Sequence, residues 1–163
     1  MKDLVVFYSR TGKTEMAARA IAVGLGADIR RLVEKRGRRG LLGFLGSGAE
    51  ARKGVESELV SPDYSLQGYD RVILCQPFWA SAAVPAMNTF LEHIDPRGKR
   101  FALVIVKGGA PAAAVLAKIT QRLESRGGKV ISTIEVQAGM GRRPALEKAM
   151  VTEVERWSAA LPR

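Results

Sequence analysis

Cysteine and histidine are almost missing from this chain, which contains one residue of each, Cys75 and His93. A single cysteine cannot form an internal disulfide and is typical of a protein in a reducing cytoplasm. One cysteine and one histidine also provide no cluster that could hold a metal ion. The sequence has no G-x-S-x-G elbow to place an activated serine beside His93, so a hydrolase triad is not indicated. We expect His93 at the surface and Cys75 in the interior.

Long apolar runs are missing too. The longest, such as 101–106, are far shorter than the about 20 residues that a helix needs to cross a bilayer. The start of the chain, Met1-Lys2-Asp3, leads directly into a strand-like segment and lacks the apolar core of a signal peptide. We therefore expect a cytoplasmic protein without a membrane span.

Acidic residues are few, with 16 Asp and Glu against 26 Lys and Arg, which gives a formal net charge of +10. Such a charge favours an acidic protein, a nucleic acid or an anionic surface as partner and says nothing about the fold. Part of it is concentrated in the basic run 30–39, which contains Arg30, Arg31, Lys35, Arg36, Arg38 and Arg39. We interpret this run as a solvated basic edge, with a docking site as the alternative.

The chain does have a regular alternation of apolar runs and helical patterns. We predict strands at Leu4–Tyr8, Asp28–Glu34, Arg71–Cys75, Phe101–Val106 and Lys129–Val136. Strands that alternate with helices indicate βαβ units and a parallel sheet, and this number of strands favours an open doubly wound sheet over a barrel. Because the 163 residues contain no long linker, we expect one α/β domain over 1–163.

Apolar residues at helical spacing predict the helices and their buried faces. The residues expected to be buried are Met16, Ala17, Ala20, Ile21 and Gly24 in the first helix, Met87, Phe90, Leu91 and Ile94 in the second, Val115, Leu116, Ile119 and Leu123 in the third, and Leu146, Met150, Val154, Trp157 and Leu161 in the last. The segment Gly37–Gly54 breaks this regularity, because each glycine weakens a helix by about 1 kcal/mol. We expect a flap or a short helix there, anchored by its leucines and phenylalanine.

The loop after the first strand, 9–14, has the composition of a phosphate-binding loop. Its hydroxyls, its glycine and its basic side chains belong to Ser9, Arg10, Thr11, Gly12, Lys13 and Thr14. A helix that begins here presents free N–H groups to an anion. The pattern differs from that of nucleotide triphosphatases, because Phe7 stands where their first glycine would be. Capping of the helix by Ser9 or Thr11 is the alternative interpretation.

Two more loops are expected at the same edge, because ligand sites of open α/β sheets lie beyond the carboxyl ends of the strands. Phe78 and Trp79 directly follow the third strand, and an indole at this place is a good platform for a flat ring. A tryptophan packed beneath a helix is the alternative. After the fourth strand, Gly108 and Gly109 permit close approach of the backbone to a ligand, and Lys107 could face an anionic edge.

These residues resemble the motifs of flavodoxin-like proteins, and the resemblance covers nearly the whole chain. Loop 9–14 is similar to the family's phosphate loop, T/S-x-T-G-x-T, and 76–80 is similar to its second flavin loop. Segment 40–45 resembles a subgroup of short members. The resemblance implies a three-layer sandwich, with helices on both faces of a five-stranded parallel sheet in the order 2-1-3-4-5, which is the order general fold rules give for flavodoxin itself.

The same resemblance implies FMN as the cofactor. The 5′-phosphate would lie in loop 9–14, Trp79 would flank the isoalloxazine ring, and 107–109 would line the pyrimidine side of the ring. The residues assigned to FMN in this way are Ser9, Arg10, Thr11, Gly12, Lys13, Thr14, Gln76, Pro77, Phe78, Trp79, Ala80, Lys107, Gly108 and Gly109. No residue is assigned a catalytic role.

Three functions fit these residues. The first is an electron carrier between partner proteins, with an acidic surface expected on the partner. The second is an FMN oxidoreductase that takes hydride from NAD(P)H and passes it to a quinone or another small acceptor. The absence of an aromatic residue in 107–111 favours this function, because one face of the flavin stays open. The third is a basic binding protein on this scaffold. The basic run 30–39 has no interleaved aromatic residues, which disfavours nucleic acid as its partner.

Overall fold

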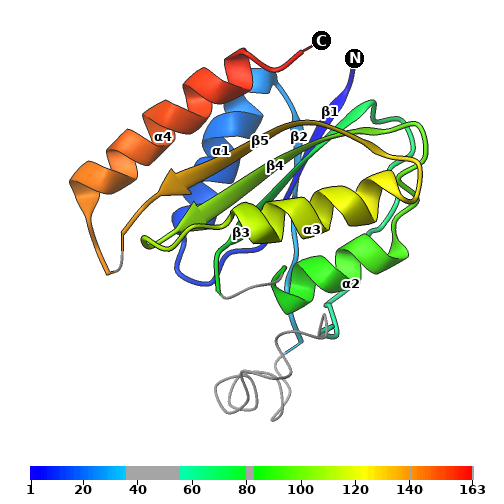
Figure 1. The fold of residues 1–163 in the computed structure, drawn as a ribbon, viewed down its shortest axis with the longest axis horizontal. Coiled ribbons are helices and arrows are strands. Elements are labelled where there is room, and N and C mark those ends of the chain that lie inside the picture. Colours follow the sequence, from blue (N-terminus) through cyan, green and yellow to red (C-terminus); the bar gives the residue numbers. More distant parts are fainter. Residues whose placement is uncertain (36–55, 80–82, 140, 163) are drawn as a thin grey trace.

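The computed structural model describes residues 1–35, 56–79, 83–139 and 141–162, which form a sheet with helices on both faces (Figure 1). The flap or short helix expected at Gly37–Gly54 lies outside the described residues. Within the described ranges, no helix is long and apolar enough to cross a membrane. Both marked chain ends lie near the amino ends of the strands, opposite the arrowheads that mark the carboxyl ends (Figure 1).

The sheet is parallel and consists of β1 (Asp3–Phe7), β2 (Asp28–Arg31), β3 (Arg71–Pro77), β4 (Arg100–Lys107) and β5 (Lys129–Gln137). Its order, β2-β1-β3-β4-β5, confirms the expected α/β architecture and strand order. β1, β3 and β4 are almost entirely buried because helices cover both faces of the sheet. The charged β2 is an edge strand, as expected, but it ends at Arg31 rather than at Glu34.

The helices of the described residues are α1 (Lys13–Leu25), α2 (Pro85–His93), α3 (Ala113–Glu124) and α4 (Pro144–Ala159). α1 and α4 cover one face of the sheet, and α2 and α3 cover the other (Figure 1). Each face has its own apolar core. Because side chains alternate between the faces of a strand, the neighbouring Ile73 and Leu74 of β3 belong to different cores.

The buried faces predicted for α2 and α3 are confirmed, since every residue expected there is buried. The prediction for α1 is wrong at Met16, whose side chain is 40% exposed, and at Gly24, which is also exposed. Ala18 and Ala22 are buried instead. Alanine is apolar but small, so alanines on several faces of this helix leave the direction of its apolar stripe undetermined by the sequence.

In α4, unlike α2 and α3, only some of the residues predicted to be buried lie in the core. Met150 and Val154 are in the core, as expected. Leu146 is 37% exposed, which contradicts the prediction, and Trp157 is only half-buried. The indole N–H of Trp157 donates a hydrogen bond to Ser132 Oγ of β5 at 2.9 Å. A polar group on the ring therefore keeps Trp157 at the margin of the core.

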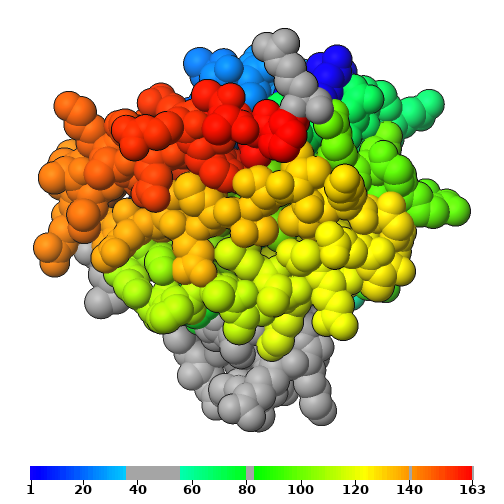
Figure 2. Space-filling view, turned by 45° about the horizontal axis from the view of Figure 1, so that its top comes forward, coloured from blue at the N-terminus to red at the C-terminus, as the bar shows by residue number. Residues whose placement is uncertain are grey.

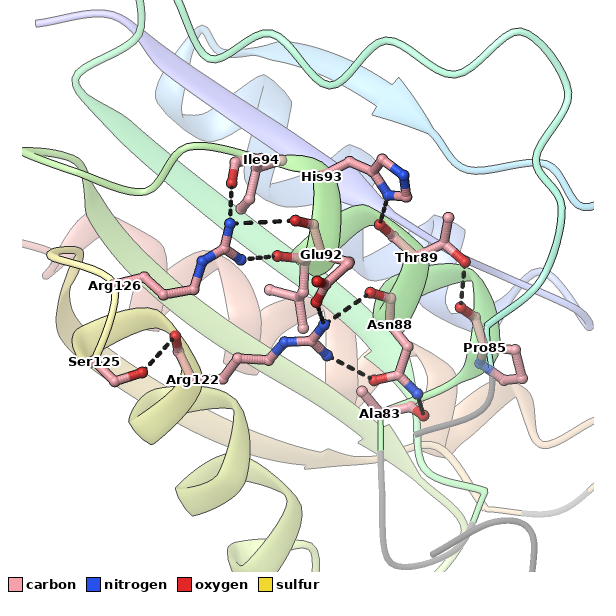
Figure 3. A network of polar contacts seen from close by, with 11 residues as sticks. Ala83, Pro85, Asn88, Thr89, Glu92, His93, Ile94, Arg122, Ser125 and Arg126 are labelled. Carbon is pink, nitrogen blue, oxygen red and sulfur yellow. Dashed lines mark hydrogen bonds and ion pairs between the residues drawn. The ribbon is translucent and has the colours of Figure 1, made fainter. Parts of the chain in front are cut away.

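Arginines at the end of α3 attach α2 to the rest of this layer (Figure 3). Arg126 donates hydrogen bonds to the backbone oxygens of Leu91, Glu92 and Ile94, where α2 ends. The last carbonyls of a helix have no partner within the helix, and a cation satisfies them well. Arg122 pairs with the Glu92 carboxylate at 2.5 Å. These bonds fix α2 and, through it, the end of the loop that follows β3.

The two rare residues lie where the sequence predicts. Cys75 is buried in β3, and burial raises the pKa of its thiol well above the ordinary value, so the thiol is unreactive. His93 is exposed at the end of α2 and stacks on Tyr64, with 4.7 Å between the ring centroids. Neither residue lies in the cleft described below.

A buried ion pair joins the amino ends of two central strands. Arg71 of β3 donates from Nε and Nη2 to the carboxylate of Asp3 in β1, at 3.0 and 2.6 Å. Its Nη1 donates to the backbone oxygen of Pro162 at 3.0 Å. Arg71 is 2% exposed and Asp3 is 7% exposed. A single guanidinium therefore connects the first strand, the third strand and the end of the described chain.

Candidate functional site

A cleft of about 460 Å³ lies at the carboxyl edge of the sheet, where the loops after β1, β3 and β4 meet. Its lining contains residues of all three predicted loops: Thr11, Lys13, Thr14, Pro77, Phe78, Trp79, Lys107, Gly108 and Gly109. The loop after β5 adds Ala138 and Gly139, which the sequence interpretation missed. They could have been predicted from the rule that ligand sites lie beyond the carboxyl ends of parallel strands, because both residues directly follow β5. The volume is in the range of small-molecule sites.

The first loop turns on Gly12, which has a φ of +90° and precedes α1. A residue with a side chain rarely adopts this left-handed conformation, which explains the glycine. The Gly12 N–H donates to Ser9 Oγ at 3.1 Å, so Ser9 stabilises the turn. No side chain caps α1, and the capping alternative is therefore not observed. The first-turn N–H groups, beside the hydroxyls of Thr11 and Thr14, remain suited to an anion.

Lys13 connects two loops. Its Nζ donates to the backbone oxygens of Ala138 at 3.0 Å, Gly139 at 2.8 Å and Gly141 at 2.5 Å. Its charge is therefore engaged in holding the loop after β5 against the loop after β1, although the side chain also lines the cleft. The sequence could not reveal this contact, because the partners are more than 120 residues away along the chain. Arg10 is exposed and is not part of the cleft lining.

Trp79 is half-buried and lines the cleft, so it is not hidden beneath a helix. The Tyr8 ring meets it edge-on, with 5.5 Å between centroids and an interplanar angle of 85°. The Arg10 guanidinium lies 5.8 Å from the centre of the Trp79 ring, within reach of a cation–π interaction. Tyr8 in turn donates its hydroxyl to Glu34 Oε2 at 2.7 Å. Burial, together with this hydrogen bond, raises the pKa of Tyr8 and keeps the donor protonated.

Gln76 belongs to the second loop by sequence but does not line the cleft. It is 2% exposed, and its Oε1 accepts a hydrogen bond from the backbone N–H of Val84 at 3.2 Å. Its Nε2 has no hydrogen-bond partner among the described residues. Gln76 therefore holds the end of the loop in front of α2 and leaves one buried donor open. Ala80, the last predicted residue of this loop, lies outside the described residues.

The third loop begins at Lys107, whose Nζ pairs with Glu135 Oε2 of β5 at 2.6 Å. The same carboxylate oxygen accepts a hydrogen bond from the Ala112 N–H at 3.1 Å. Lys107, followed by the Ala112 N–H, lowers the pKa of Glu135. The positive charge of Lys107 is thus largely balanced, and Glu135 fixes both ends of the loop. Gly108 and Gly109 line the cleft between them and present backbone without side chains.

Replacing Glu135 by Gln should lower the free energy of unfolding by about 1 kcal/mol at neutral pH. The pKa of Glu135 is lower in the folded than in the unfolded protein, so its stabilisation is present above the ordinary pKa of 4.5 and is lost as the pH falls below that value. The wild-type protein and Glu135→Gln should therefore converge in urea unfolding at acidic pH.

Glu153→Gln, on the exposed side of α4, is the matched control, and it should show no such convergence. A constant difference between Glu135→Gln and the wild-type protein at all pH values would mean that the carboxylate charge does not fix this loop.

The fold and the cleft define a class: an open parallel α/β protein with its site beyond the carboxyl ends of β1 and β3, where the strand order reverses. No protein-family model and no curated protein matches the chain. Many solved structures do. The chain has the flavodoxin-like fold, as its motifs predict.

Three of these structures show the extent of the likeness. A protein from Bacteroides uniformis has a TM-score of 0.74 at 20% identity, over 96% of each chain. A flavoprotein in complex with FMN, from Lactobacillus acidophilus, has a TM-score of 0.64 at 19% identity, over 96% of this chain and 98% of its own. Oxidised flavodoxin 1 from Bacillus cereus has a TM-score of 0.61 at 19% identity, over 99% and 100%.

Proposed function

We propose that the protein binds FMN and transfers electrons between partner proteins in the cytoplasm. One observation carries the proposal: a single cleft combines the start of a helix, with its free N–H groups, and a half-buried indole. The first feature suits a phosphate and the second a flat aromatic ring. The likeness to a flavoprotein in complex with FMN supports the same ligand.

The residues of the cleft fit this cofactor. The first-turn N–H groups of α1 and the hydroxyls of Thr11 and Thr14 would hold the phosphate, and the left-handed Gly12 keeps the loop backbone free of a side chain. Trp79 would pack against the ring, and the backbone of Gly108 and Gly109 would meet its polar edge. When bound, FMN supplies one-electron and two-electron redox chemistry, while the protein positions and tunes it.

An NAD(P)H-dependent FMN oxidoreductase is the second candidate. The observation that favours it is the glycine-lined third side of the cleft, formed by Gly108, Gly109 and Ala110. A cleft wall without a large side chain leaves room for a nicotinamide or a small acceptor beside the flavin. A carrier, in contrast, exchanges electrons only with partner proteins.

The visible spectrum of the purified protein with added FMN tests both candidates. We expect yellow protein that retains FMN through gel filtration, and that NADPH does not bleach without air unless a reductase is added. Bleaching by NADPH alone would instead establish the oxidoreductase. Protein that leaves the gel-filtration column colourless after addition of FMN would exclude both candidates.

Replacement of Trp79 by Ala should weaken FMN binding by about 1–3 kcal/mol, by analogy with the stacking of nucleic-acid bases on aromatic side chains. The tryptophan fluorescence of the wild-type protein should be strongly quenched by FMN, and Trp79→Ala should lose this response. Trp157→Phe is the control, because Trp157 lies between α4 and β5 and does not line the cleft. Quenching that survives in Trp79→Ala but disappears in Trp157→Phe would contradict the assignment.

A further inference from the structure

Charges at the carboxyl edge of the sheet are paired unevenly. The carboxylates there have partners. Glu135 binds Lys107, Glu34 accepts from Tyr8, and Glu15 pairs with arginines 19 and 31. Glu147, in the first turn of α4, lies 3.8 Å from Lys13 Nζ and accepts a hydrogen bond from the Arg143 backbone N–H at 3.3 Å. Three arginines at the same edge, Arg10, Arg142 and Arg143, are exposed. Among the described residues, none of these three side chains makes an ion pair with a carboxylate. The edge therefore carries an excess of positive charge that the described carboxylates do not balance.

Two apolar side chains are exposed at the same edge of the sheet. Met16 in the first turn of α1 is 40% exposed, and Leu146 in the first turn of α4 is 37% exposed. Both helices begin at this edge, and the Lys13 contacts to Gly139 and Gly141 hold their starts together. Figure 2 shows the beginning of α4, in orange, projecting from the molecule above the yellow-green turn that follows β4. Leu146 and Arg143 both pack around Gly139, and exposed apolar residues near arginines are the composition of a protein-docking surface.

The basic run 30–39, in contrast, is already neutralised where the structure describes it. Arg30 pairs with Asp63 at 2.5 Å, Arg31 pairs with Glu15 at 3.3 Å, and Lys35 pairs with Glu58. Each basic side chain in the described part of this run therefore has a carboxylate partner within the protein. Among the described residues, the unpaired arginines of this edge therefore lie in loop 9–14 and at the start of α4, outside the described part of the basic run.

We propose that Arg10, Arg142 and Arg143, with Met16 and Leu146, form the docking surface for an acidic partner protein. Each guanidinium can bind a carboxylate in a bidentate manner, and the two apolar side chains provide area to exclude water. The surface adjoins the cleft, because Gly139 lines the cleft and packs beside Arg143 and Leu146. That the partner exchanges electrons rests on the proposed function; that it is acidic rests on the surface itself.

The same residues do not suit a nucleic acid. None of the five is aromatic, so the surface provides no ring on which bases could stack. An RNA ligand would therefore depend on phosphate contacts alone. An acidic protein can use both the arginines and the apolar side chains.

Binding of a fluorescein-labelled peptide rich in glutamate and leucine, followed by fluorescence anisotropy at low ionic strength, tests the proposal. Arg142→Gln/Arg143→Gln should weaken binding about tenfold. The control Lys129→Gln/Arg156→Gln removes the same charge from exposed positions at the start of β5 and the last turn of α4. It should change binding less than about twofold. Added salt should weaken the wild-type complex and shrink the difference between the two variants.

Three results would overturn the proposal. The first is no binding of the peptide to the wild-type protein, and the second is an equal loss in both double variants, which would indicate net charge alone. The third is tighter binding of a single-stranded oligonucleotide that Arg142→Gln/Arg143→Gln abolishes. FMN binding is measured separately by absorbance. Its absence from the wild-type protein would exclude the proposed function and leave the peptide result standing.

Discussion

Replacement of both Thr11 and Thr14 by Val should weaken FMN binding by about 3–6 kcal/mol and change riboflavin binding little. The two ligands differ by the phosphate, and each hydrogen bond to a charged group contributes about 1.5–3 kcal/mol. Both threonines line the cleft at the start of α1. Dissociation constants for both ligands, measured by flavin fluorescence, check the expectation.

Valine is the appropriate substitution because Thr14 is only 2% exposed and valine preserves its shape. The free energy of unfolding of the variant, measured in parallel, separates lost contacts from lost structure. Thr152→Val on the exposed side of α4 is the control and should leave both affinities unchanged. Equal losses for FMN and riboflavin would place the phosphate elsewhere.

Arg71→Met should lower the free energy of unfolding by about 3–5 kcal/mol, because it leaves the Asp3 carboxylate buried without its partner. Urea unfolding at neutral pH measures this loss. The double variant Asp3→Leu/Arg71→Met should recover most of it, since a buried ion pair adds little over well-packed apolar side chains.

Arg97→Met provides the comparison for this substitution. Arg97 makes a similar bidentate contact with Asp95, at 2.7–2.9 Å, but both side chains are exposed, so its loss should have little effect on stability. A double variant as unstable as Arg71→Met would show that the lost bond to the Pro162 backbone oxygen, and not the uncompensated carboxylate, dominates.

Much of the fold could be predicted because the central strands and the faces of α2 and α3 consist of large apolar residues. Leu, Ile, Phe and Val define a buried stripe without ambiguity, as α3 demonstrates. α1 is rich in alanine, and the sequence alone places its buried stripe on Met16 and Gly24, whereas Ala18 and Ala22 are the buried residues. The end of β2 depends on its neighbour, because Glu34 bridges to Leu59 outside the parallel sheet, and a local pattern does not contain that pairing.

The cleft could be predicted from its loops, but the partners of its charged residues could not. Loop 9–14 and Trp79 were identified because glycine, hydroxyl and aromatic residues are unusual directly after a buried strand. Lys13 and Lys107 carried the correct charge in the correct place, yet both are engaged by other parts of the protein. Such pairing depends on the tertiary structure. A sequence therefore shows which residues are charged but not which groups they pair with.

The three carbonyl contacts of Lys13 have a consequence for the order in which the site forms during synthesis. Loop 9–14 leaves the ribosome well before its partners, because its lysine binds Ala138, Gly139 and Gly141, which lie 125 to 128 residues further along the chain. α1 likewise packs against α4, the last helix. The nascent chain can form β1, β3 and β4 early, since each pairs with a strand already made or soon to follow. The cleft, however, can be completed only after the loop that follows β5 has been translated.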